Sequence, residues 1–220
     1  MAKLKSILGM GVYGLPEAAR LARVHTSTAR RWYVGGSGHT ALLSASIPRV
    51  NGRTAISFLD LVDLLVVGQF RSAGVSFQTI RRAYGILQRR FDTAHAFSHR
   101  SLLTDGHTIL VEYMNELGDD HLEDVITGQR AMPEILREYL KEIDYDDATN
   151  LAKQWHVASG VLIDPRRNFG KPIVPSGVST SVIYSSAKGN NNDYELVADL
   201  FGISTESVRD AVIFEQELAA

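Results

Sequence analysis

The sequence predicts a mainly α-helical protein with small β-hairpins. We expect a winged helix-turn-helix at the N-terminus and, at the C-terminus, a small β-strand and three-helix module with a helix-turn-helix shape. Three observations predict this fold. Capping residues precede several runs of apolar residues at helical spacing, Asn51-Gly52 is a strong hairpin-turn signal, and the charge divides the chain. Residues 1–100 carry fourteen Lys and Arg against four Asp and Glu, whereas residues 101–220 carry nine against twenty-one.

The first predicted elements are two short helices joined by a tight turn. The first covers residues 15–22, with Pro16 in its first turn, and Thr26 is predicted to cap the second, which runs to about Tyr33. In a winged helix-turn-helix the second helix lies in the DNA major groove and the wing contacts the backbone. Hydroxyl groups at a helix start favour phosphate, and arginine binds phosphate or guanine. We predict DNA contacts through Thr26, Ser27, Thr28, Arg30 and Arg31 on the second helix and through Arg49 and Arg53 beside the Asn51-Gly52 turn.

The rest of the basic half is predicted as a hairpin and two longer helices. The hairpin covers residues 47–56. Ser57 and Asp60 have the spacing of a capping box at the start of a helix over residues 58–71. Ser76 is predicted to cap a further helix that runs to Arg90.

The central segment, residues 91–150, is predicted to contain a second hairpin and an acidic helical region. Alternating residues around 94–97 and 108–111 favour two strands, residues 133–143 favour a helix, and residues 145–150 resemble a linker. We therefore expect three parts: residues 1–90 for DNA binding, this central segment, and residues 155–220 for dimerisation or partner binding.

The C-terminal part is predicted to hold strands at residues 161–163 and 172–174 and three short helices. Residues 193–220 contain seven acids and one arginine, and repulsion by phosphate argues against a second DNA-binding site. A protein interface is the better interpretation, with a domain that only packs on its neighbour as the alternative. We predict a homodimer contact through apolar residues at helical spacing, namely Val208, Ala211, Val212, Phe214 and Leu218.

The basic half resembles the MerR-like helix-turn-helix family over Tyr13 to about Tyr84. The matching stretches are YGLPEAARLA at residues 13–22, TARRW at 28–32, ISFLD at 56–60 and AGVSFQTIR at 73–81. Arg23 stands where that family usually has glycine in the turn. The resemblance implies a DNA-binding winged helix-turn-helix.

The acidic half is similar to the small DUF433 domain over about Val161 to Glu215. The stretches that carry this similarity are DPRRNFGKPIV at residues 164–174, GVST at 177–180, YELVADLFGI at 194–203 and VRDAVIFE at 208–215. That family is linked with VapB-type antitoxins, whose partners are PIN-like ribonuclease toxins. The order of the two modules resembles the longer antitoxins of that group.

The sequence shows no constellation typical of an enzyme. It has no cysteine, so thiolate metal sites and cysteine nucleophiles are excluded. The glycines of residues 9–14 match a dinucleotide pattern, but the acidic residue that this pattern requires is absent. His95, His99 and His107 have no fourth ligand at zinc spacing. We expect no catalytic residue, no metal and no cofactor.

These observations predict a cytoplasmic DNA-binding antitoxin without a membrane span. It would repress its own promoter as a homodimer on double-stranded DNA and neutralise a PIN-like ribonuclease. The alternative is a MerR-like transcriptional regulator that senses a small effector through its C-terminal half.

Overall fold

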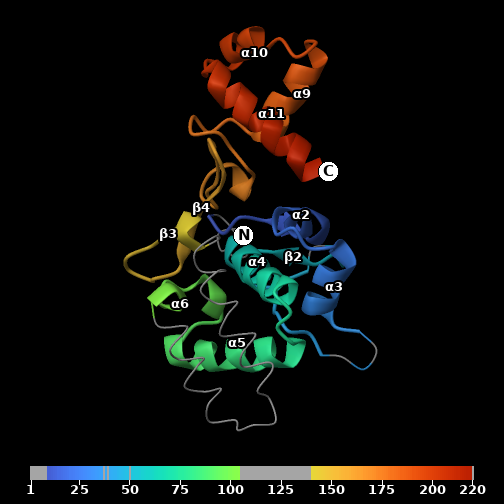
Figure 1. Cartoon of the computed structure of the whole chain (residues 1–220), viewed down its shortest axis with the longest axis vertical. Coiled ribbons are helices and arrows are strands. Elements are labelled where there is room, and N and C mark those ends of the chain that lie inside the picture. Colours follow the sequence, from blue (N-terminus) through green and yellow to red (C-terminus); the bar gives the residue numbers. More distant parts are fainter. Residues whose placement is uncertain (1–8, 37, 39, 50, 105–139, 220) are drawn as a thin grey trace. The chain divides into compact units, whose positions relative to one another are not determined.

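The structure is a computed structural model that describes residues 9–36, 38, 40–49, 51–104 and 140–219. It forms two compact units. The N-terminal unit is Tyr13–Ala152, and the C-terminal unit combines Lys153–Ala220 with the described residues of Met1–Val12. Figure 1 colours Tyr13–Ala152 from blue through green to yellow and Lys153–Ala220 from yellow-orange to red.

The N-terminal unit is built mainly from helices. Its elements are β1 (Tyr13–Gly14), α2 (Leu15–Leu21), α3 (Thr26–Val34), β2 (Ala55–Ile56), α4 (Phe58–Ser72), α5 (Phe77–Phe91), a 3₁₀ turn at Ala96–Ser98, α6 (Ser101–Thr104), a 3₁₀ turn at Leu140–Glu142 and β3 (Ile143–Tyr145). The bounds of the first four predicted helices agree with α2, α3, α4 and α5 to within one residue at each end, because each has its own start or stop signal.

Helices α2 and α3 form a tight pair. Pro16 lies at the start of α2, and the turn between the helices passes through Arg23, whose φ of 54° is in the left-handed region. Thr26 was predicted as the cap of α3. The structure instead places the cap at His25, whose Nδ1 accepts a hydrogen bond from the Ser27 amide at 3.3 Å. Imidazole therefore takes the role that the sequence pattern assigns to a hydroxyl.

Helix α4 forms the centre of the N-terminal unit. Its N-terminus has the predicted capping box, in which the Ser57 hydroxyl accepts from the Asp60 amide and the Asp60 carboxylate accepts from the Ser57 amide. Most of its side chains are buried, and it packs against α2, α5 and the Ala96–Ser98 turn. Burial on nearly all sides explains the continuous apolar run in this segment.

The predicted hairpin over residues 47–56 is wrong in its pairing. Asn51 and Gly52 form a turn, both with positive φ, but β2 pairs antiparallel with β1, so that Tyr13 is opposite Ile56 and Gly14 opposite Ala55. A turn signal fixes the reversal of the chain and does not choose the strand partner. The partner here comes from the segment before α2.

Two predictions for the central segment are also wrong where the structure describes it. Residues 94–97 do not form a strand, because they lead into the 3₁₀ turn at Ala96–Ser98 with Phe97 fully buried. Within the predicted helix over residues 133–143, Leu140–Glu142 form a 3₁₀ turn and Ile143 begins β3. Residues 105–139 lie outside the described part, and so do the predicted strand at 108–111 and most of that helix.

The C-terminal unit is a small sheet region followed by three helices. Its elements are β4 (Ala152–Ala158), which enters it from the first unit, β5 (Val161–Ile163), a 3₁₀ turn at Asn168–Gly170, α9 (Thr180–Gly189), α10 (Tyr194–Phe201) and α11 (Thr205–Ala219). Strands β4 and β5 pair antiparallel, and Ile173 makes single bridges to Leu162 and Ser179, so the predicted strand at 172–174 is reduced to bridges. The sequence patterns gave no signal for β4.

Helices α9, α10 and α11 enclose a common apolar core (Figure 1). Asp193 caps α10, Gly202 ends it in the left-handed region, and the Ser204 hydroxyl accepts from the Ser207 amide at the start of α11. The core consists of Val174, Ile183, Ala187, Val197, Ala198, Val208, Ala211 and Val212.

Most residues of the apolar stripe predicted for dimerisation are buried within this unit. Val208, Ala211 and Val212 are buried within the unit itself, and Phe214 is buried as well, whereas Leu218 is half-buried. The stripe is therefore not an uncovered surface, and the physical reason for assigning the dimer contact to these residues fails. The dimer stays a prediction.

The mainly α-helical fold with small antiparallel sheets is confirmed. In the part of the chain that the structure describes, no helix has the combination of length and hydropathy that a bilayer span requires.

Candidate nucleic-acid interface

Helix α3 has one buried and one exposed side. Ala29, Trp32 and Tyr33 are buried beneath it, with Ala18 and Ala19 of α2 in the same small core. The opposite side is exposed at Thr26, Ser27, Arg30 and Arg31, and Thr28 is half-buried. The five predicted DNA-contacting residues of α3 are therefore presented by one short, firmly packed helix.

The two predicted wing arginines are also exposed. Arg49 and Arg53 lie on either side of the Asn51-Gly52 turn, and Arg53 lines a shallow hollow with Gly14 and Ala55. Because β2 pairs with β1, this turn is anchored to the segment that precedes α2.

The loop that follows α3 is held by backbone and arginine contacts. The amides of Leu42 and Leu43 donate to the Trp32 carbonyl, and the Arg81 guanidinium donates to the carbonyls of Thr40 and Ala41 at 2.6 and 2.9 Å. The MerR-like stretch that ends at Arg81 therefore has a structural role here: it fixes the exit of the predicted DNA-contacting helix.

The surface of the basic half is more basic than its composition. Among residues 1–100 the acids are Glu17, Asp60, Asp63 and Asp92, and both Asp60 and Asp63 are 1% exposed. The described arginines of this half are instead at the surface or half-buried. Burial of half the acids leaves a surface potential that suits a polyanion.

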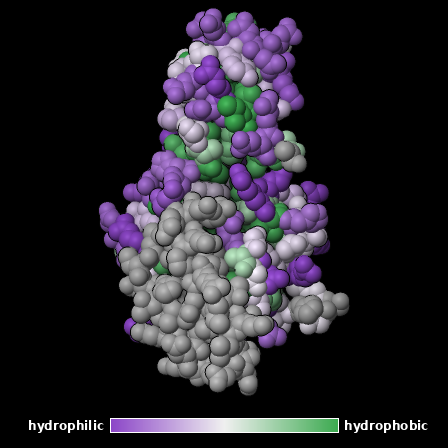
Figure 2. All heavy atoms as spheres, in the orientation of Figure 1, coloured by the Kyte–Doolittle hydropathy of each residue, from purple (hydrophilic) through white to green (hydrophobic). Residues whose placement is uncertain are grey.

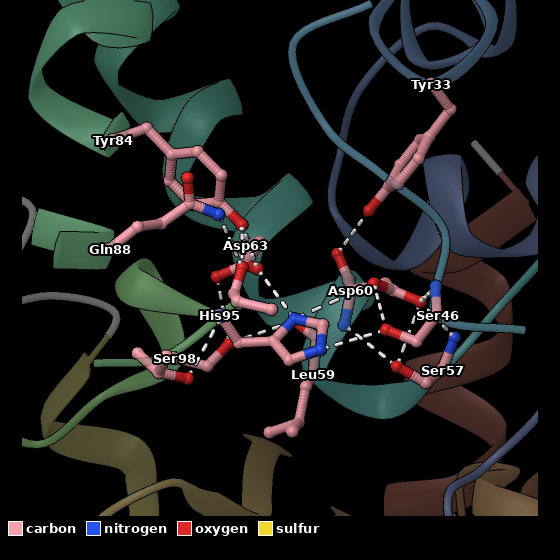
Figure 3. A network of polar contacts seen from close by, with 12 residues as sticks. Tyr33, Ser46, Ser57, Leu59, Asp60, Asp63, Tyr84, Gln88, His95 and Ser98 are labelled. Atoms are coloured by element: carbon pink, nitrogen blue, oxygen red, sulfur yellow. Dashed lines mark hydrogen bonds and ion pairs between the residues drawn. The ribbon is translucent and has the colours of Figure 1, made fainter. Parts of the chain in front are cut away.

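Asp60 is buried, and its carboxylate and carbonyl oxygens accept several hydrogen bonds (Figure 3). Its carboxylate accepts from the Ser57 amide and hydroxyl and from the Ser46 amide and hydroxyl, at distances between 2.8 and 3.0 Å. Its backbone carbonyl accepts from the Tyr33 hydroxyl at 2.6 Å. The network therefore connects α3 directly to the start of α4.

Asp63 lies one turn further along α4 and has a second set of partners. Its carboxylate accepts from the Tyr84 hydroxyl at 2.8 Å and the Ser98 hydroxyl at 3.1 Å, and His95 Nδ1 lies at 3.0 Å (Figure 3). His95 Nε2 lies 2.9 Å from the Ser46 hydroxyl. The imidazole thus joins the segment before Phe97 to both carboxylates.

The protonation of this cluster follows from its burial. Burial raises the pKa of Asp63, against the lowering effect of His95 and Tyr84. Burial lowers the pKa of His95, but the hydrogen bond to Asp63 and the charges of Asp63 and Asp60 outweigh it, so the pKa of His95 is raised. The contact with Asp63 and the nearby Asp60 therefore favours the protonated form of His95.

The histidines considered for zinc are not brought together as ligands. His95 contacts Asp63, and the ring of His99 stacks on Phe91 with centroids 4.7 Å apart. His107 lies outside the described residues. Within the described ranges no group of three or more His, Asp or Glu residues could hold a metal ion.

A hollow of about 560 Å³ lies beside the start of α3 and was not predicted. Arg23 from the α2–α3 turn, Arg31 from α3 and Arg71 from the end of α4 all line it. Its shape depends on Gly68, since a Cβ at this position would lie 2.7 Å from the Val24 side chain. Sequence reasoning missed this site because its arginines come from three separate elements. The one signal was Arg23 at a position where the MerR-like family usually has glycine.

Helix α10 of the C-terminal unit has an acidic and apolar surface, in contrast to α3. Leu196 and Leu200 on α10 are 42% and 62% exposed, and Val182 and Ile213 are also exposed. Around the two leucines, Asp193, Glu195 and Asp199 are exposed. Figure 2 shows apolar surface in green among hydrophilic surface in purple on this unit.

The chain is similar along nearly its whole length to a known protein and to a solved structure. The chain is 28% identical over 223 residues to a Mycobacterium tuberculosis (strain ATCC 25618 / H37Rv) protein named "Putative antitoxin VapB45", covering 91% of this chain and 92% of that protein. The crystal structure of Rv2018 from Mycobacterium tuberculosis has a TM-score of 0.77 and 27% identity, covering 91% of this chain and 96% of that one. No family model matches the sequence.

Proposed function

We propose that this protein is a cytoplasmic, non-enzymatic antitoxin that binds the double-stranded promoter DNA of its own operon and neutralises a PIN-like ribonuclease. The observation that carries the proposal is the exposed hydroxyl and arginine face of α3. The similarity of the chain, over 91% of its length, to the protein named "Putative antitoxin VapB45" supports the proposal further. The opposite net charges of residues 1–100 and residues 101–220 support separate partners for DNA and toxin.

DNA binding would use α3 as the helix in the major groove. Arg30 and Arg31 are exposed and long enough to reach guanine or phosphate, and Thr26 and Ser27 lie at the helix start, where amides favour a phosphate. Arg49 and Arg53 would contact the flanking backbone. The MerR-like assignment and the winged helix-turn-helix mode of docking belong to this proposal.

The DNA-binding test uses the intergenic DNA upstream of the gene. Arg31→Ala and Arg53→Ala are expected to weaken binding, and each lost phosphate contact lowers the magnitude of the log–log salt slope by roughly 0.9. Arg90→Ala on α5 is the matched control, since it removes the same charge from an exposed position away from α3. Unchanged affinity and slope for both test variants would eliminate α3 and the turn as the DNA-contacting surface.

The toxin would contact α10 of the C-terminal unit. A ribonuclease must hold RNA phosphates, so the rim of its active site is expected to be basic. The exposed Leu196 and Leu200 supply apolar area, and the surrounding carboxylates supply complementary charge, which raises the association rate. DUF433-like modules would then serve partner binding here.

The toxin test measures RNA cleavage by the ribonuclease encoded in the neighbouring reading frame. The full chain is expected to inhibit cleavage, and the double variant Leu196→Ser, Leu200→Ser is expected to lose inhibition while it keeps promoter binding. Val182→Ser on α9 is the control, because Val182 is exposed to a similar degree without the same acidic surroundings on its own helix. Full inhibition by the double variant would exclude α10 as the contact.

We also retain the homodimer, because one helix pair reads a short site and two copies extend it to a palindrome. Sedimentation of the full chain at about 10 μM, on the affinity scale of protein complexes, is expected to give a dimer. A monomer that binds the promoter with full affinity contradicts it.

A regulator that responds to a small effector is the second candidate. The hollow of about 560 Å³ beside α3 favours it. Co-purification of a ribonuclease with the chain supports the antitoxin, whereas an effector that changes promoter affinity in the absence of any protein partner supports the regulator.

A further inference from the structure

We propose that the hollow between the α2–α3 turn, the start of α3 and the end of α4 is a binding site for a phosphate group. This inference deepens the proposed function where the phosphate belongs to DNA and goes beyond it where the phosphate belongs to a free compound. Every residue of the site lies in the N-terminal unit.

The first argument is charge. Arg23, Arg31 and Arg71 converge on one hollow, and His25 also lines it. Among the described residues, no carboxylate lines the hollow or forms an ion pair with any of these three arginines. Three arginines that line one hollow concentrate positive charge there, and a bound anion offsets that charge.

The second argument is the kind of donor that the hollow offers. Thr28, Thr40 and Ser72 add hydroxyl groups to the guanidinium groups. Arginine forks and hydroxyl donors match the several oxygens of a phosphate better than the two oxygens of a carboxylate. The hollow also adjoins the first turn of α3, where the helix dipole favours an anion.

The third argument is size. A volume of about 560 Å³ is within the range of sites that hold small molecules, so the hollow has room for a phosphate and the group that it is attached to. That group is either the sugar of a DNA strand bound across α3 or the rest of a free nucleotide. Both sources share the phosphate chemistry, and the experiment separates them.

The fourth argument is the conformation of Arg23. Its backbone φ of 54° lies in the left-handed region, where glycine is favoured because it has no Cβ. A second feature holds the other side of the site in place: Arg71 donates to the Val75 carbonyl at 2.5 Å. The Arg71 guanidinium is therefore held by a backbone carbonyl, and Arg23 occupies its turn position at a cost in backbone conformation.

The experiment uses the full chain with Trp155→Phe, so that Trp32, which lines the hollow, is the sole tryptophan. The probes are inorganic pyrophosphate, deoxyadenosine 5′-monophosphate and a random-sequence DNA duplex. Pyrophosphate is expected to change the Trp32 emission and raise the unfolding midpoint. Arg71→Gln and Arg23→Gly are each expected to weaken its binding at least tenfold, whereas Arg90→Ala is expected to leave it unchanged.

The source of the phosphate follows from the other two probes. If it is the DNA backbone, Arg71→Gln lowers the magnitude of the salt slope for the duplex by roughly 0.9, and pyrophosphate competes with the duplex. If it is a free nucleotide, the mononucleotide binds at least tenfold more tightly than pyrophosphate, and Arg71→Gln leaves the duplex affinity unchanged. Either result supports the site.

Two results overturn the proposal. One is an unchanged Trp32 emission and unfolding midpoint with pyrophosphate and mononucleotide, together with an unchanged duplex slope in both variants. The other is an equal loss in Arg90→Ala, which would show attraction by net charge alone. Pyrophosphate binding is measured without DNA or toxin, so it can fail while promoter binding by Arg30 and the rest of α3 stands, and it can succeed if promoter binding fails.

Discussion

The chain contains two helix pairs of similar shape, α2–α3 and α10–α11, one in each unit. Both have a residue in the left-handed region at the turn, Arg23 with φ 54° in the first pair and Gly202 with φ 61° in the second. In both pairs a side chain caps the second helix by accepting a hydrogen bond from a backbone amide. His25 accepts from Ser27 in the first pair, and Ser204 accepts from Ser207 in the second. Each unit therefore contains two consecutive helices joined by a short turn with one residue of positive φ.

The two pairs differ in what they present to solvent. The first exposes Arg30 and Arg31 on its second helix, whereas the second exposes Glu206 and Glu217 on its second helix and Leu200 on its first. A polyanion is attracted to one surface and repelled by the other. The comparison teaches that a helix pair identifies a scaffold, and that the charge on its surface decides which partner the scaffold can bind.

The interiors of the two units differ as well. The N-terminal unit joins α3, α4 and α5 through a buried polar network around Asp60 and Asp63, and the helices of the C-terminal unit pack around an apolar core. Polar networks are sensitive to the loss of a single member, because the remaining buried groups are left without partners. One tryptophan in each unit, Trp32 and Trp155, allows the two interiors to be tested separately.

Asp60→Ala is expected to have the largest effect. It removes the capping box of α4 and takes the acceptor from the buried Ser57 amide and from the amide of the more exposed Ser46, so the N-terminal unit should lose about 4 kcal/mol of unfolding free energy. Denaturant unfolding followed through Trp32 in a Trp155→Phe chain measures it. An equal loss reported by Trp155 in a Trp32→Phe chain would show that the two interiors are not independent.

Ile183→Ala is the corresponding change in the C-terminal unit. Ile183 is fully buried in the three-helix core, and removal of its side chain should lower the unfolding free energy of that unit by about 3 kcal/mol. The unfolding midpoint seen through Trp155 is expected to fall, and the proposed affinity for promoter DNA is expected to stay unchanged. Exposed Val182→Ala on the same helix serves as the control, with a shift close to zero.

The outcome for the interiors shows how far local sequence signals reach. The capping box at Ser57 and Asp60, the Ser76 cap of α5 and the end of α10 at Gly202 were predictable, because each depends on residues within one turn of the chain. The burial of Asp63 was not, since its partners Tyr84 and Ser98 come from distant segments. Asp63 in an apolar helix was nevertheless the available signal for a buried polar network.

The same limit applies to the sites. The exposed residues of α3 were predictable, because the spacing of Ala29 and Trp32 fixes which side of the helix is buried. The burial of the stripe at Val208, Ala211 and Val212 was predictable, but helical spacing does not show what covers a face, and here the core of the unit itself covers these residues. The hollow beside α3 required the tertiary placement of Arg71.

The next largest effect that we expect is a pH dependence of the stability of the N-terminal unit, which contains His95. The pKa of His95 is raised in the folded protein, so its stabilising contribution is fully present below the unfolded value of about 6.5 and is lost as pH rises through the higher folded value. The Trp32 transition should therefore shift to lower denaturant as pH rises from 6 to 9. His95→Gln is expected to flatten this dependence, and a slope that is the same in both proteins would show that His95 does not carry the compensating charge.

The smallest effects that we predict come from substitutions at the turn residue of each helix pair, Arg23 and Gly202. Arg23→Gly should raise the unfolding free energy of the N-terminal unit by up to about 1 kcal/mol, because glycine adopts a positive φ without a Cβ penalty. Gly202→Ala should lower that of the C-terminal unit by about the same amount. A Cβ at Gly202 would meet no atom within 4 Å, so the change reports backbone conformation alone.

Arg23→Gly is nevertheless expected to weaken binding of pyrophosphate at the hollow. A variant that is both more stable and weaker in phosphate binding would show that Arg23 is retained for its charge at the expense of stability. A gain in stability with unchanged phosphate and DNA binding would leave the arginine without a role in the hollow.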